Sequence, residues 1–138
     1  MLVRPILRVA VAVAALAATS CGGGGPNLYP VKGSVLYLEK PAAGATVVFQ
    51  PLNSTPESLM PTGVVGEDGT FNLKTPPHGD GAPAGEYVVL VTLFPPNARE
   101  MRNPHSLLPV WYGSPVDSPL RATVTPGNNQ LEPFRLTK

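Results

Sequence analysis

Proline and glycine are so frequent in this chain that only short helices or strands fit between them. All fourteen glycines and all but one of the eighteen prolines lie from Gly22 onward. Proline breaks helices and interrupts the hydrogen bonds of central strands, and glycine weakens both kinds of element. Together they form about a quarter of this part of the chain, close to the roughly 25–30% at which disorder becomes a serious alternative. The pattern of the residues between them must therefore decide whether the chain folds.

Apolar side chains between these residues recur mostly with the two-residue period of half-buried strands. Seven segments show such alternation or a longer apolar run, and they are residues 31–37, 45–50, 62–66, 70–75, 85–93, 120–124 and 134–137. A disordered chain would not contain seven such runs, so the pattern favours a folded domain. We predict an all-β fold, a single seven-stranded antiparallel β-sandwich at residues 30–138.

Two of the expected strands carry more specific predictions. An Asp-Gly pair, Asp68-Gly69, separates two β-forming segments and predicts a hairpin, because glycine takes the positive φ that such a turn requires. Beyond it, Phe71 and Leu73 should face inward while Asn72 and Lys74 face water.

The longest apolar run, at residues 85–93, is apolar on both faces, and we expect it to be a central strand covered on both sides. Near the C-terminus, Pro133 cannot donate a hydrogen bond to a neighbouring strand. The last strand should therefore begin late or lie at an edge.

The N-terminus has the composition of an export signal. Arg4 and Arg8 form a short positive region, residues 9–18 form an unbroken apolar run, and small residues lead into Cys21. The apolar run is half of the roughly 20 residues that a helix needs to cross a bilayer, which argues against an uncleaved anchor. We therefore assign residues 1–20 to a signal peptide.

The segment Ala17-Ala18-Thr19-Ser20-Cys21 resembles the lipobox of bacterial lipoproteins, although Ala18 stands where leucine is commonest. The resemblance implies diacylglycerol on the thiol of Cys21, cleavage before it, and attachment to the membrane through the lipid. Residues 21–29 would then be the lipidated cysteine and a glycine-rich tether. By the sorting rules of lipoproteins, Gly22 favours the outer membrane. The alternative is an ordinary signal in which Cys21 is incidental, and the position of the chain's one cysteine argues against it.

The remaining chain resembles carboxypeptidase-regulatory-like domains. The similarity lies in strand starts and turns at residues 31–35, 41–47, 66–71 and 83–89, and in a tail at 111–120 that is similar to short bacterial lipoproteins with this domain. The resemblance implies a transthyretin-like (prealbumin-type) β-sandwich. Such motifs specify a fold far better than a function.

Charge and chemistry exclude several functions. From residue 21 onward eight positive side chains stand against nine negative ones with no basic stripe, so we expect no nucleic-acid partner. We find no catalytic triad, paired carboxylates or phosphate loop, and we expect neither an enzyme nor a cofactor. A loop-based metallohydrolase that uses His78, Asp80 and His105 is the weakest alternative, because solvated loop histidines are the simpler interpretation.

Residues 94–119 connect the expected strands at 85–93 and 120–124, and this connection is too long to be a simple link. Its apolar residues could fold back and cap the sandwich. Alternatively, Trp111 and Tyr112 could form an exposed aromatic platform for a sugar ring or a partner protein. We expect a lipid-anchored, non-catalytic binding or structural module of the cell envelope, with an envelope protein or polysaccharide as partner. The alternative is a carbohydrate-binding module that uses Trp111 and Tyr112.

Overall fold

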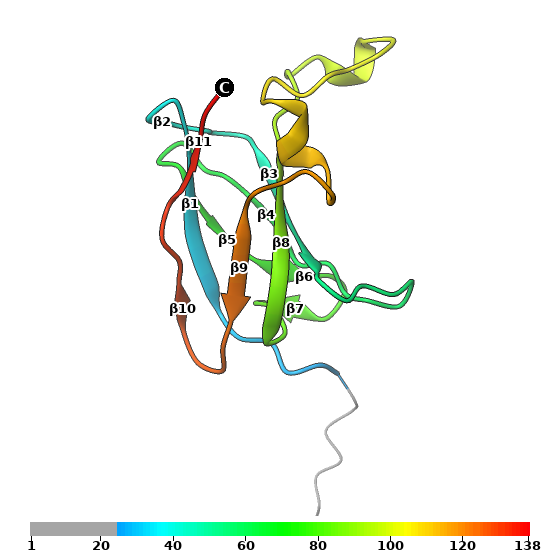
Figure 1. The fold of residues 1–138 in the computed structure, drawn as a ribbon, viewed down its shortest axis with the longest axis vertical. Helices are drawn as coiled ribbons and strands as arrows, with labels where there is room; N and C mark the ends of the chain where they lie inside the picture. Colours follow the sequence, from blue (N-terminus) through cyan, green and yellow to red (C-terminus); the bar gives the residue numbers. More distant parts are fainter. Residues whose placement is uncertain (1–24) are drawn as a thin grey trace, which may run out of the picture.

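A computed structural model describes residues 25–138, so the expected signal peptide and the thiol of Cys21 lie outside the described residues. The described chain is built almost entirely from strands, in two sheets that pack face to face (Figure 1). Its helical parts are two short 3-10 turns, η1 (Ala98–Glu100) and η2 (Val110–Gly113). Among the described residues we find no helix with the length and apolar character needed to span a membrane. The predicted all-β sandwich is confirmed.

One sheet is antiparallel throughout. Its strand order is β7-β6-β4-β3-β8-β9, and the bounds are β3 (Thr46–Pro51), β4 (Thr62–Val64), β6 (Lys74–Thr75), β7 (Gly79–Asp80), β8 (Gly85–Thr92) and β9 (Arg121–Val124). The longest strand, β8, lies between β3 and β9, which confirms its predicted central position.

The other sheet is organised around β1 (Val31–Tyr37). Its antiparallel partners are β2 (Lys40–Pro41) and β5 (Thr70–Asn72), and its parallel partners are β10 (Asn129–Gln130) and β11 (Phe134–Leu136). The two parallel pairings differ from the expected antiparallel arrangement. They arise because the chain turns back after β9 and then runs beside β1 in the direction of β1 itself. An alternation pattern does not specify the direction in which neighbouring strands run. As expected from Pro133, the last strand begins at Phe134 and pairs with β1 alone.

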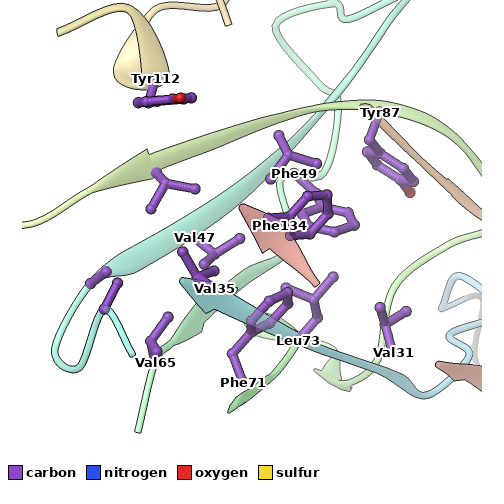
Figure 2. Packing of buried hydrophobic residues seen from close by; sticks show 14 of the residues in the cluster. Val31, Val35, Val47, Phe49, Val65, Phe71, Leu73, Tyr87, Tyr112 and Phe134 are labelled. Carbon is purple, nitrogen blue, oxygen red and sulfur yellow. The ribbon is translucent and has the colours of Figure 1, made fainter. Parts of the chain in front are cut away.

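An aromatic cluster fills the space between the sheets (Figure 2). The ring of Phe49 contacts those of Phe71, Tyr87 and Phe134 at centroid distances of 6.3, 5.6 and 6.5 Å. Most of these contacts are edge-on or tilted, the arrangements that aromatic pairs favour. Since the rings come from four strands in both sheets, the cluster joins the two layers.

The segment after the Asp-Gly turn points its side chains as predicted but belongs to both sheets. Phe71 and Leu73 are each 1% exposed, and Asn72 and Lys74 lie in solvent. Residues before Leu73 pair with β1, whereas Lys74 pairs with Thr62 of β4. The expected single strand at 70–75 is therefore two strands, β5 and β6. The chain passes from one sheet to the other at Leu73. The Leu73 N–H donates to the Val31 carbonyl, and the Leu73 carbonyl accepts the Gly81 N–H.

Candidate functional site

The long connection between β8 and β9, which we call the 94–119 segment, lies at one end of the sandwich. Figure 1 shows it at the top, beside the C-terminus, whereas the chain enters the domain from the N-terminal side at the bottom. The two ends are joined by the length of β8. The segment that sequence reasoning singled out is thus at the opposite end from the expected lipid tether.

Hydrogen bonds tie the second half of the segment to β8 and its continuation. The hydroxyl oxygen of Ser106, in the middle of the segment, accepts the backbone N–H groups of Leu93 and Leu108, at 3.0 and 3.2 Å. Near the C-terminal end, the Ser118 hydroxyl donates to the carbonyl of Val89 at 2.6 Å, and Ser118 is 2% exposed. Residues 106–118 are therefore held against the domain at both of their ends.

Tyr112 is a buried residue of the domain core. Its side chain is 4% exposed and lies under η2 at one end of the buried cluster (Figure 2). The phenol oxygen donates to the carbonyl of Thr137 at 3.2 Å and accepts the Thr137 N–H at 2.9 Å. Burial acts to raise the pKa of this phenol, but hydrogen-bond donation from Thr137 to the phenol oxygen outweighs it and lowers the pKa overall. With Leu108, which is 3% exposed, Tyr112 caps the sandwich.

Trp111 lies beside Tyr112 but faces solvent. Its side chain is 39% exposed, and its ring is 5.7 Å from that of Tyr112 with an interplanar angle of 46°. Because Tyr112 is buried, the two rings do not form one open platform. Trp111 alone of the pair can contact a ligand without rearrangement.

The 94–119 segment carries most of the exposed apolar side chains of the described residues. Among all the described residues, ten large hydrophobic side chains are exposed. Six of these ten belong to the 94–119 segment: Phe94, Met101, Leu107, Val110, Trp111 and Val116. Val110 and Val116 are the most open, at 82% and 89%. Sequence reasoning did not pick these two valines as contact residues, because the alternation rule does not apply to an irregular segment.

The segment also encloses a hollow of about 350 Å³, lined among others by Phe94, His105, Ser106 and Val110. Its volume is at the lower end of the range of small-molecule sites, roughly 300–1,000 Å³. Its lining mixes apolar side chains with the Ser106 hydroxyl and the His105 imidazole. Chemically, it suits an apolar group that carries a hydrogen-bonding edge.

The other candidate residues do not assemble into a site. Among residues 25–138 the structure has no group of three or more histidine, cysteine or acidic side chains that could hold a metal ion. His78 lies between β6 and β7, Asp80 ends β7, and His105 lines the hollow of the 94–119 segment. Cys21, the expected site of lipid attachment, lies outside the described residues.

Comparisons with known proteins place no relative beside this chain: no protein-family model, curated protein or solved structure gives a significant match.

Proposed function

We propose that this protein is a lipid-anchored, non-catalytic module of the cell envelope that binds an envelope protein or polysaccharide through the 94–119 segment. The observation that carries the proposal is the location of the exposed apolar side chains. They concentrate in this segment, which lies at the far end of the domain from the N-terminal entry. Exposed apolar groups gathered in one region are a common feature of interaction surfaces.

The anchor is the part of the proposal that rests on sequence. The lipobox-like segment before Cys21 supports attachment through a thioether-linked lipid, with the outer membrane favoured by Gly22. The strand starts and turns similar to carboxypeptidase-regulatory-like domains support a compact β-sandwich as the unit that the anchor carries. An anchor at one end and a contact surface at the other would present the surface away from the bilayer.

A differential capture experiment tests the contact surface. Tagged full-length protein is cross-linked in its own envelope, and the captured partners are compared between the wild type and a Val110→Ser/Val116→Ser variant. The matched control is Val64→Ser, because Val64 is 67% exposed but lies on β4, outside the segment. We expect the double variant to lose a partner that the control retains. Equal capture by all three proteins would contradict the proposal.

A carbohydrate-binding module is the second candidate, favoured by the exposure of Trp111. An open tryptophan ring can stack on the apolar face of a sugar. The chain has a single tryptophan, so its fluorescence reports on this residue alone. If the candidate is right, a polysaccharide in a test panel shifts or quenches the emission, and Trp111→Phe weakens retention on that polysaccharide. An emission spectrum that no polysaccharide changes counts against it.

A further inference from the structure

The end of the domain where the tether enters has an apolar surface of its own. A hollow of about 420 Å³ lies between the loop that joins β3 to β4 and the residues that open β8. Pro26, the residue after the glycine run, forms part of its wall together with Leu52, Leu59 and Tyr87. The loop and the tether entry are therefore neighbours.

Side chains of this loop are open to solvent. Leu52 is 46% exposed, Met60 is 44% exposed, and Leu59 is partly exposed. We call these three residues the tether-end rim. The loop is held in place because the Leu52 N–H donates to the Glu86 carbonyl at 3.1 Å, and the Phe49 N–H donates to the Pro61 carbonyl at 2.8 Å. The rim is thus fixed at the same end of β3 and β8 as Pro26.

The length of chain before Pro26 limits what can cover this rim. Four glycines separate Cys21 from Pro26, and the five Cα-to-Cα steps of a fully extended chain span at most about 18 Å. The eight residues of β8 span about 26 Å. With lipid on Cys21, so short a tether keeps Pro26, and with it the end of the domain that carries the tether-end rim, near the bilayer. The 94–119 segment reaches the bilayer only if the domain lies flat.

We propose that the tether-end rim docks into the interfacial region of the lipid bilayer, so that the domain stands on the membrane with its 94–119 segment outward. This proposal rests on lipidation of Cys21. Two or three apolar side chains bind a bilayer weakly by themselves. A short tether makes the contact intramolecular, and the high effective concentration that results allows a small apolar area to suffice.

The charges around the rim do not favour an electrostatic contact with anionic lipid headgroups. Glu57 lies within the loop and Glu86 lines the hollow, and both are exposed. These carboxylates would be repelled by anionic headgroups, so anionic lipid should not be required. The docking should therefore occur on vesicles of neutral phosphatidylcholine.

Depth-dependent quenching tests the orientation. Full-length Leu52→Cys, Met60→Cys and Val116→Cys proteins are purified from membranes, labelled with a thiol-reactive, environment-sensitive fluorophore, and reconstituted into phosphatidylcholine vesicles with brominated acyl chains. We expect several-fold stronger quenching at positions 52 and 60 than at position 116, the control at the opposite end. Equal quenching at the three positions would overturn the proposal. Unchanged Trp111 emission verifies that each variant is folded.

The mass of the labelled protein separates the two proposals. A mass that includes one fluorophore and the lipid means that the thiol of Cys21 is already occupied, as the anchor requires. In that case, absence of quenching at positions 52 and 60 refutes docking and leaves the anchor standing. Two fluorophores per chain mean that Cys21 is free, and both proposals then fail.

Discussion

At the scale of single residues, Gly33 shows how closely a core ring can lie over the neighbouring strand of its own sheet. Gly33 of β1 is in register with Phe71 of β5, and a Cβ atom at position 33 would lie 2.6 Å from Cζ of the Phe71 ring. Phe71 is 1% exposed and packs on Phe49 and Phe134, so its ring has no space to move into. Glycine is required here because the ring takes the place of a side chain.

We expect Gly33→Ala to lower the free energy of unfolding by about 1–3 kcal/mol, the usual cost of overpacking a core. The reduced entropy of the unfolded chain opposes this loss by less than about 1 kcal/mol. Urea denaturation followed by circular dichroism measures the change, and Ser34→Ala on the same strand is the control. A Gly33→Ala protein as stable as Ser34→Ala would show that the ring can move aside.

The Asp68 carboxylate gives the turn a dependence on pH. Its Oδ1 accepts the N–H and the hydroxyl of Thr70 at 3.1 and 2.8 Å, and these hydrogen bonds hold the pKa of Asp68 below its ordinary value of 3.8. A lowered pKa in the folded state means that the contribution to stability is complete above the unfolded value and is lost as the pH falls through the folded one. We expect Asp68→Asn, whose amide carries no charge, to lose less thermal stability than the wild type between pH 5 and pH 2, by scanning calorimetry. Parallel melting curves for both proteins across this range would contradict the assignment.

At the scale of elements, the 94–119 segment depends on the Ser106 hydroxyl. This oxygen accepts two backbone N–H groups, those of Leu93 and Leu108. Leaving a buried amide without a partner costs about 1–3 kcal/mol. We expect Ser106→Ala to loosen the segment, with faster hydrogen exchange at residues 93 and 108 and unchanged exchange in β3. Exchange at 93 and 108 as slow as in the wild type would show that the segment is held by its apolar contacts alone.

The elements also show how far the sequence alone can lead. Alternation located the strands and the inward side chains, because burial on one face leaves a two-residue period. It did not predict the division of residues 70–75 between two sheets, since Phe71 and Leu73 point to the same core from either layer. Alternation also could not predict that Tyr112 is buried while its neighbour Trp111 is exposed. An irregular segment has no period from which to assign a buried face.

At the scale of the whole molecule, the two apolar surfaces lie at opposite ends of one compact sandwich. The tether-end rim is next to Pro26, and the 94–119 segment follows the far end of β8. In the proposed arrangement one surface meets the bilayer and the other meets a partner. The sandwich between them would act as a spacer, which requires a rigid core of the kind that the four aromatic rings provide.

The orientation and the function both depend on lipid at Cys21, and removal of the thiol tests this dependence. We expect the wild type to incorporate radiolabelled palmitate and to sediment with membranes, and Cys21→Ser to do neither. Burial of fatty chains contributes about 0.8 kcal/mol for each methylene, far more than the half-exposed Leu52 and Met60 can supply. The rim alone should therefore not retain the Cys21→Ser protein on the membrane. Equal labelling of the two proteins would refute the anchor.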